Sequence, residues 1–440
     1  MIRVPLKPPH PERVCWGCDK YCPADELTCG NGTERTPHPV ELFGDDWQQW
    51  AASDNAPEAA TASEASTATS NSPSDHRPMK HAEHPFIAIW ETTQACDLVC
   101  QHCRACARPQ RDPDELTTEE GFALLRQLRA GGVPLVVLTG GDPAKRPDLL
   151  ELVRYGVSQG LHLGLTPSAT PLVTNELVYQ LSRAGLHRLA ISLDGHTAEI
   201  HDAFRGVQGS FSDAVRILNA AKACGLRSQV NTTVHAGTIH RLRDVAALVD
   251  ELGSVLWSVF YIVPTGRAEE RMLPSAEAVE ATLHELATIA ATARFAVKTT
   301  AAPHYRRVLA QRKAEGAAAV QHGTFGKQGE RVNDGRGFLF VSHRGEIFPS
   351  GFLPIPCGNV RSENPIDVYR DDPLFQRLRD ATALTGKCGA CEYRHLCGGS
   401  RARAYAMTGN ALGSDPLCSY VPPGYDPERR PGPRRLEVVE

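Results

Sequence analysis

The 440-residue sequence lacks any apolar run of the roughly 18 residues that a membrane-spanning helix requires. Its first fifteen residues contain prolines and charges where a signal peptide has an apolar stretch. An excess of positive charge is also missing, because 47 Lys and Arg stand against 51 Asp and Glu, and this excludes a basic footprint for nucleic acid. The composition excludes collagen, a coiled coil and a wholly disordered chain. These absences predict a cytoplasmic protein without a membrane or nucleic-acid partner.

A local absence divides the chain. Residues 51–75 contain no Val, Ile, Leu or aromatic residue, and seventeen of these twenty-five residues are Ala, Ser or Thr. Such a segment cannot bury enough apolar surface to offset the entropy lost on ordering. We therefore predict a disordered linker over 51–80, which separates an N-terminal module, 1–50, from the remaining chain. The Pro- and Arg-rich tail, 422–440, is also expected to be disordered.

Cysteine, by contrast, is present in an informative pattern: twelve of the fourteen cysteines form three groups of four. In a reducing compartment, closely spaced cysteines bind metal more often than they form disulfides. Three metal-binding sites are therefore expected. The groups are Cys15, Cys18, Cys22 and Cys29; Cys96, Cys100, Cys103 and Cys106; and Cys388, Cys391, Cys397 and Cys418.

Short apolar runs alternate with amphipathic helical patterns from about residue 80 to 290. Strands are predicted over 86–90, 135–138, 162–165, 188–193, 228–234 and 256–262. Helices are predicted over 119–130, 149–159, 175–184, 213–224, 239–252 and 276–293, the first with a capping box from Thr117 and Glu120. Six βα units indicate an α/β protein with a parallel sheet, either doubly wound or curled into a full or partial barrel. Its chemistry is expected at the C-terminal ends of the strands. A β-hairpin is predicted over 338–348.

The central cysteines follow the first predicted strand directly. Three thiolates, from Cys96, Cys100 and Cys103, can hold three irons of a 4Fe-4S cube and leave the fourth iron open to a ligand. Cys106 could instead close a four-cysteine site. The next strand runs into Gly140, Gly141, Asp142 and Pro143, where two glycines permit close backbone approach to a ligand and Asp142 adds a carboxylate. This turn favours the open site, with Cys106 a bystander.

The Cys-x3-Cys-x2-Cys loop and the Gly-Gly-Asp-Pro turn resemble the radical SAM superfamily. The resemblance implies a partial (β/α)6 TIM-like barrel over 81–300. It also implies an enzyme that reductively cleaves S-adenosylmethionine at a 4Fe-4S cluster and abstracts hydrogen from a substrate with the resulting 5'-deoxyadenosyl radical. An electron donor such as flavodoxin or ferredoxin would supply the reducing electron. The implied cluster ligands are Cys96, Cys100 and Cys103, and the implied S-adenosylmethionine contacts include Gly140, Gly141, Asp142 and Pro143.

This chain departs from the family pattern at two positions. Asp142 replaces the commoner glutamate but keeps the carboxylate, and His102 stands where an aromatic residue is usual and keeps a flat ring that could lie near the adenine. Further cofactor contacts are expected from later strands, at Ser168, Ser192 and Asp194. Arg205 resembles an arginine that often meets the cofactor carboxylate. For each of these residues, capping, turn formation or a satisfied barrel interior is the alternative.

The C-terminal cysteine group permits zinc by spacing alone. The sequence around it resembles the SPASM extension of radical SAM enzymes, whose full pattern has seven cysteines and two auxiliary clusters. Arg401 and Ser350 stand where two of those cysteines would be. The resemblance therefore implies a small α+β iron-sulfur extension over 301–421 with one auxiliary 4Fe-4S cluster. Its ligands would be Cys388, Cys391, Cys397 and Cys418.

The N-terminal group resembles a short bacterial domain of unknown function. A module of about fifty residues rarely folds without a metal or a partner, so metal binding is expected there. Zinc and a third iron-sulfur cluster both remain open for Cys15, Cys18, Cys22 and Cys29.

The substrate class is predicted by resemblance. Three stretches, 100–109, 138–149 and 165–171, resemble the heme-biosynthesis branch of the superfamily. In that branch the radical attacks a propionate side chain of a tetrapyrrole. A peptide-modifying SPASM maturase is the alternative within the enzyme class. A non-catalytic iron-sulfur carrier is the alternative outside it, although a carrier would need neither the glycine turn nor six βα units.

Overall fold

The computed structural model describes residues 82–316 and 332–426. The N-terminal module with Cys15, Cys18, Cys22 and Cys29, the predicted linker and residues 427–440 lie outside these ranges, and the predictions made for them stay predictions.

One ten-stranded sheet organises the described residues, in the order β10-β9-β8-β1-β2-β3-β4-β5-β6-β7. The strands β8 and β1 to β7 pair in parallel, whereas β9 and β10 pair antiparallel at one edge. The strands are β1 (Ile87–Glu91), β2 (Leu135–Thr139), β3 (His162–Leu165), β4 (Arg188–Ser192), β5 (Ser228–Val234), β6 (Leu256–Tyr261), β7 (Ala296–Thr300), β8 (Phe338–Val341), β9 (Glu346–Phe348) and β10 (Gly358–Asn359).

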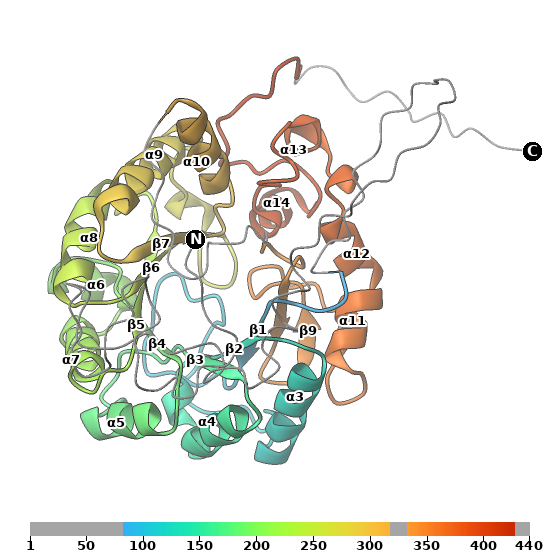
Figure 1. The fold of residues 1–440 in the computed structure, drawn as a ribbon. Helices are drawn as coiled ribbons and strands as arrows, with labels where there is room; N and C mark the ends of the chain where they lie inside the picture. Colours follow the sequence, from blue (N-terminus) through green and yellow to red (C-terminus); the bar gives the residue numbers. More distant parts are fainter. Residues whose placement is uncertain (1–81, 317–331, 427–440) are drawn as a thin grey trace, which may run out of the picture. The chain divides into compact units, whose positions relative to one another are not determined.

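The sheet curves into an arc with helices outside it, and β7 and β10 form its two unpaired edges (Figure 1). This confirms the predicted α/β class with an open barrel. The helices are α3 (Thr118–Ala130), α4 (Leu149–Ser158), α5 (Asn175–Arg183), α6 (Ala198–Arg205), α7 (Ser210–Ala223), α8 (Leu242–Glu251), α9 (Ala276–Thr292), α10 (Tyr305–Ala314), α11 (Pro365–Asp371), α12 (Pro373–Arg379), α13 (Gly386–Ala390) and α14 (Arg401–Thr408). Short 3-10 turns are η3 (Pro143–Lys145), η4 (Ile239–Arg241), η5 (Glu270–Met272) and η6 (Ala381–Ala383). None of the helices in the described ranges is long and apolar enough to cross a membrane.

All six predicted strands are present, and two of them, β3 and β5, have the predicted bounds. The capping box at the start of α3 is confirmed, because Thr117 accepts from the Glu120 N–H and the Glu120 carboxylate accepts from the Thr117 N–H. The strand β7 and the helix α6 were not predicted. The barrel therefore has a seventh consecutive parallel strand beyond the six of the sequence prediction.

The outward faces of the strands form the main core. Trp90 of β1 lies against Gly121 of α3, where an added Cβ would come within 2.6 Å of the indole, and Trp257 of β6 packs edge-on against Phe295. Burial of each large apolar side chain contributes roughly 1.5–3 kcal/mol. Since alternate residues of a strand face opposite sides, the inward positions can be polar, as at Asn231 and Ser258.

The predicted β-hairpin is confirmed as β8 and β9, and β8 extends the barrel sheet by pairing with β1. The extension that follows contacts both sides of the open barrel. Ile366 of α11 covers Gly131 at the end of α3, and Arg403 of α14 donates to the Tyr261 carbonyl at the end of β6. The C-terminal cysteines are thereby held beside the barrel end where chemistry is expected.

Candidate active site and a second thiol pocket

The loop after β1 gathers the three predicted central thiols. Cys96 and Cys100 are buried with Leu98 in a small cluster, and the half-buried Cys103 packs against it. Cys106 is exposed and lies outside this cluster, with a positive φ of 47°. The geometry thus separates three thiols from the fourth, and the role of Cys106 as a bystander stays a prediction.

Each of the three thiols receives a hydrogen-bond donor. The Leu98 N–H donates to Cys96 Sγ and the Ala107 N–H to Cys103 Sγ, each over 3.4 Å, while Arg205 Nη1 lies 3.8 Å from Cys100 Sγ. Burial raises the pKa of the Cys100 thiol, although the Arg205 cation opposes this, and burial likewise raises the pKa of Cys96. Donors aimed at sulfur stabilise thiolates that ligate iron. The donor set therefore fits a thiolate-bound cluster.

The predicted glycine turn packs against the cysteine loop. Gly141 donates its N–H to the Thr93 carbonyl over 2.8 Å, and Asp142 donates its N–H to the Ala95 carbonyl over 2.6 Å. An added Cβ would lie 2.5 Å from the Thr93 oxygen at Gly140 and 2.4 Å from the Ala95 oxygen at Gly141. The close approach that both glycines permit in this structure is to the backbone that carries the cysteines.

The Asp142 side chain is fully buried and bonded within the protein. It accepts from Thr170 Oγ1 over 2.7 Å and from the Ala144 N–H over 3.1 Å, where it caps η3, which Pro143 begins. Burial raises the pKa of this carboxyl group. Asp142 also accepts from the N–H of Ser168, whose Oγ lies 3.2 Å from Cys96 Sγ. Asp142 therefore links the end of β3 to the thiol loop.

Arg205 and Asp194 form an ion pair behind Cys100, with Arg205 Nε 2.6 Å from Asp194 Oδ2. Burial alone would raise the pKa of Asp194, but the Arg205 guanidinium holds it below its usual value. The Thr233 N–H donates to the other carboxylate oxygen over 2.6 Å. Ser192, at the end of β4, is half-buried just before this pair. The structure thus brings Ser168, Asp194 and Arg205 to the thiol loop.

His102 lies in a stack of three rings. Phe204 is the middle ring, with its centroid 4.1 Å from that of the His102 imidazole and 4.3 Å from that of His235. Burial lowers the pKa of His102 to about 3, so the ring is neutral at physiological pH. One face of the predicted flat ring is therefore covered by Phe204.

Sequence reasoning missed a second polar network, which joins the thiol loop to the extension. Glu91, the last residue of β1, pairs with Arg104 and with His343 Nδ1, the latter over 2.7 Å. The Arg104 guanidinium lies 4.6 Å above the Phe340 ring of β8. Burial would raise the pKa of Glu91, but Arg104 and His343 hold it below its usual value. The sequence signal for this network was Glu91, a carboxylate at the end of an apolar strand shortly before the cysteines.

The four C-terminal thiols line a single pocket. Backbone N–H groups donate to two of them over 3.4 Å, Asp415 to Cys388 and Gly399 to Cys397. Burial raises the pKa of the Cys397 and Cys418 thiols. The pocket is also lined by Arg307, Lys387 and Tyr420. A convergent four-thiol set with donors and cations around it fits a cluster ligated by four cysteines.

The residues at two of the missing SPASM cysteine positions make structural contacts. Arg401 is buried and donates to the carbonyls of Ala411 and Gly413, and its Nη2 lies 3.5 Å from Cys388 Sγ. Ser350 is buried and accepts from the Phe352 N–H over 3.2 Å. Within the described ranges, no three His, Cys, Asp or Glu side chains gather closely enough to hold a single metal ion.

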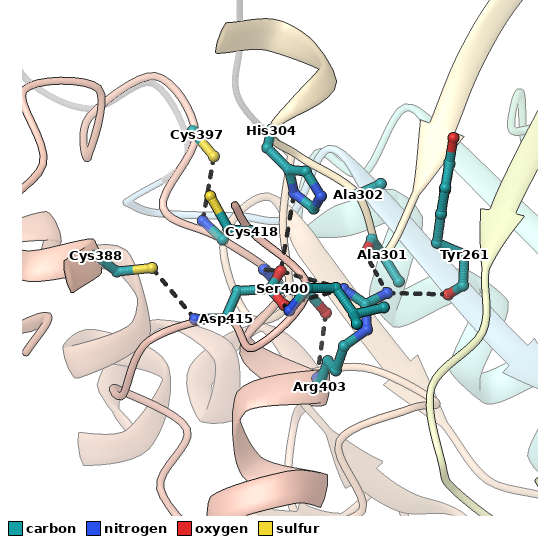
Figure 2. A network of polar contacts seen from close by, with 12 residues as sticks. Tyr261, Ala301, Ala302, His304, Cys388, Cys397, Ser400, Arg403, Asp415 and Cys418 are labelled. Carbon is teal, nitrogen blue, oxygen red and sulfur yellow. Dashed lines mark hydrogen bonds and ion pairs between the residues drawn. The ribbon is translucent and has the colours of Figure 1, made fainter. Parts of the chain in front are cut away.

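A buried ion pair joins the thiol pocket to the barrel (Figure 2). Arg403 Nη1 lies 3.1 Å from both oxygens of Asp415, and neither side chain is exposed to solvent. Arg403 also donates to the carbonyls of Tyr261 and Ala301, beyond which His304 approaches Asp415 to 3.8 Å. Asp415, whose N–H donates to Cys388 in the pocket, is thus held through Arg403 at the ends of β6 and β7.

An open parallel barrel with a thiol loop at the C-terminal end of its first strand is the scaffold of a barrel enzyme built around an iron-sulfur centre. Residues 90–251 match the family described as Radical SAM superfamily, and residues 1–50 match one described as Protein of unknown function (DUF3079). An AdoMet-dependent heme synthase from Oleidesulfovibrio alaskensis is 40% identical over 340 residues, which cover 76% of this chain and 87% of that protein. The chain belongs to the radical SAM superfamily and is a radical SAM enzyme. Membership implies a 4Fe-4S cluster that works with S-adenosylmethionine.

Other relatives extend the comparison. The AdoMet-dependent heme synthase of Methanosarcina barkeri is 37% identical over 77% of this chain and 97% of its own length. The mycofactocin maturase MftC of Mycobacterium ulcerans is 32% identical over 80% of this chain and 93% of its own length. The crystal structure of Streptococcus suis SuiB bound to S-adenosylmethionine shares the fold, with a TM-score of 0.62 at 17% identity over 77% of this chain and 78% of that one.

Replacing Gly141 by alanine should lower release of 5'-deoxyadenosine about a hundredfold, because the new Cβ would displace the cysteine loop and small displacements of reacting groups have effects of that size. The assay is anaerobic turnover of S-adenosylmethionine by the reconstituted protein. Gly164→Ala on β3 is the matched control, because its Cβ would meet nothing closer than 3.4 Å. Equal activity of the two variants would show that the turn does not hold the loop.

Proposed function

We propose that this radical SAM enzyme acts on a tetrapyrrole and converts a propionate side chain to a vinyl group. The observation that carries the proposal is the extension, which gathers one four-thiol pocket and has Arg401 and Ser350 at two of the other SPASM cysteine positions. The similarity to AdoMet-dependent heme synthases over most of their length supports the same substrate class. The peptide-modifying alternative is supported by the weaker similarity to the mycofactocin maturase.

The chain's own residues would prepare this reaction. We propose that Cys96, Cys100 and Cys103 hold the catalytic cluster and that the turn from Gly140 to Pro143 fixes their loop. When bound, the cluster would supply the electron that cleaves S-adenosylmethionine to a 5'-deoxyadenosyl radical. The Arg205–Asp194 pair would keep a cation beside Cys100 and so neutralise negative charge at the thiolates.

The reaction balances in atoms and electrons. A propionate loses one hydrogen atom to the 5'-deoxyadenosyl group, then releases carbon dioxide and one electron, and the vinyl group remains. The released electron needs an acceptor. We propose that the four-thiol pocket of Cys388, Cys391, Cys397 and Cys418 holds an auxiliary 4Fe-4S cluster, which would be that acceptor. A flavodoxin or ferredoxin would be the external donor.

The substrate proposal is tested by anaerobic turnover with an iron-bound tetrapyrrole that carries propionates. The expected product is lighter by carbon dioxide and two hydrogens for each converted side chain in its neutral form, and 5'-deoxyadenosine accumulates with it. Active S-adenosylmethionine cleavage without that mass change would overturn the substrate proposal and direct the search to peptides.

Replacing Cys388 by alanine should remove about four iron atoms per chain while S-adenosylmethionine cleavage in the absence of substrate persists. The reason is that Cys388 lines the C-terminal pocket and not the loop after β1. Iron and zinc are counted after anaerobic reconstitution. Cys357→Ala serves as the control, since its half-buried thiol donates to the Ile355 carbonyl and does not line the pocket. An unchanged iron count with zinc lost instead would contradict the auxiliary cluster.

The N-terminal module remains a separate proposal. We propose that Cys15, Cys18, Cys22 and Cys29 bind zinc or a third iron-sulfur cluster. The same metal count on a Cys18→Ala variant of the full chain distinguishes the two, by loss of zinc or of iron.

A further inference from the structure

Arg401 is a buried cation that forms no ion pair with a carboxylate among the described residues. Its side chain donates to the backbone carbonyls of Gly399, Ala411 and Gly413, and its Nη2 lies 3.5 Å from Cys388 Sγ. Only 2% of the residue is exposed to solvent. Burial of an uncompensated charge is unfavourable, so an anion is expected at the atom that Nη2 faces. That atom is a sulfur of the four-thiol pocket.

The surroundings of Arg401 hold its guanidinium at this sulfur. Gly399 has a φ of 65°, and an added Cβ there would come within 2.6 Å of Arg401 Nη2 and 3.0 Å of Cys388 Sγ. The glycine therefore leaves room for the cation to approach the thiol. Because the guanidinium is buried, its charge acts on the sulfur at short range with little screening by solvent.

Further cations surround the same pocket. Arg307, Lys387 and Arg394 line it, and no aspartate or glutamate is among the described residues that do so. Arg307 is paired with Glu280. The Lys387 ammonium instead donates to the Cys418 carbonyl and forms no ion pair in the described part of the chain. The pocket wall therefore carries positive charge that no carboxylate of the wall neutralises.

Asp415 lies next to the pocket but does not add a free anion. Its carboxylate is paired with Arg403, and its backbone N–H donates to Cys388 Sγ over 3.4 Å. Donors and cations that face thiolates stabilise negative charge on them. Reduction adds an electron to a cluster that four thiolates already make negative, so these surroundings favour the reduced state.

We propose that Arg401 and Lys387 raise the reduction potential of the auxiliary cluster and so make it a good electron acceptor. The inference rests on the proposed function, in which this cluster takes up the one electron that leaves the substrate with carbon dioxide. An oxidised flavodoxin or ferredoxin would remove that electron before the next turnover. Arg401 would have the larger effect, because its guanidinium reaches Cys388 Sγ directly. Neither residue would touch the substrate.

The test is an anaerobic redox titration of the full-length reconstituted protein, followed by electron paramagnetic resonance. The signal of the auxiliary cluster is the one that Cys388→Ala removes. Arg401→Gln should make reduction about tenfold less favourable, which lowers the potential by about 59 mV for one electron. Lys387→Gln should lower it by a smaller amount. Arg401→Lys keeps the charge and should retain most of the wild-type potential.

Arg379→Gln is the matched control. Arg379 is also a buried arginine that donates to backbone carbonyls, those of Tyr369 and Arg370, but it does not line the thiol pocket. Its variant should keep the wild-type potential even where it loses stability. Iron is counted on every sample, so that a potential is compared only between proteins that hold the same clusters.

A wild-type potential in Arg401→Gln with its iron retained would overturn the inference and leave the auxiliary cluster standing. An equally low potential in Arg401→Lys or Arg379→Gln would also overturn it, because the effect would then not come from the charge. If Arg401→Gln did not hold its cluster, the potential of Lys387→Gln would decide in the same way. If the wild type had no signal that Cys388→Ala removes, the auxiliary cluster of the proposed function would fail, and this inference with it.

Discussion

Replacement of Cys100 by alanine should abolish cleavage of S-adenosylmethionine, with a fall of about a thousandfold or more, which corresponds to roughly 4 kcal/mol in the activation barrier. Cys100 is buried between Cys96 and Cys103 and is the thiol that faces the Arg205 guanidinium. Without it, two thiols remain to hold a cluster that needs three protein ligands. The protein should also bind about four fewer iron atoms per chain after anaerobic reconstitution.

Cys106→Ala is the matched control for this experiment. Cys106 lies six residues further along the same loop, but it is exposed and outside the thiol cluster. Its variant should keep its iron and its cleavage activity. If Cys106→Ala lost a cluster as completely as Cys100→Ala, the central group would be a closed four-cysteine site and the catalytic assignment would fail.

The regular part of the barrel was predictable because hydrophobic periodicity alone specifies it. The runs over 162–165 and 228–234, HLGL and SQVNTTV, are short, carry leucine or β-branched residues and are bounded by turn residues, and their predicted bounds are those of β3 and β5. The strand β7 was not predicted because Lys298 interrupts its apolar pattern, although an inward-facing residue of an open barrel can be charged. The helix α6 was not predicted because it is only eight residues long and is separated from α7 by a short glycine-containing turn.

The site was predictable in its residues but not in all their contacts. Spacing placed the thiols and the glycine turn on adjacent loops, and the β1–β2 pairing brings those loops together. Nothing in the sequence shows, however, that Gly140 and Gly141 make room for the carbonyls of Thr93 and Ala95. Those partners are backbone atoms about 45 residues away, and since every residue has a carbonyl, residue types do not reveal which carbonyl a glycine contacts. The same holds for Asp142, whose carboxylate is used by Thr170 and the turn itself.

The buried Arg403–Asp415 pair should be the most sensitive link between the extension and the barrel. Arg403→Met would leave the Asp415 carboxylate buried without its cation and would remove donors from the carbonyls of Tyr261, Ile262 and Ala301 (Figure 2). Breaking a buried pair on one side costs about 3–5 kcal/mol. We expect a loss of that size in the free energy of unfolding, measured anaerobically on the reconstituted protein by chemical denaturation.

Two further variants separate the buried charge from lost packing. Adding Asp415→Asn to Arg403→Met should recover part of the stability, because the uncompensated charge is gone, while the Asp415 backbone N–H still donates to Cys388. Arg294→Met removes an exposed arginine from its pair with Asp250 and should change stability by no more than about 1 kcal/mol. If Arg403→Met cost no more than Arg294→Met, the extension would be held by its apolar contacts. If the asparagine brought no recovery, the loss would come from the unbonded carbonyls of Tyr261, Ile262 and Ala301 and not from the charge.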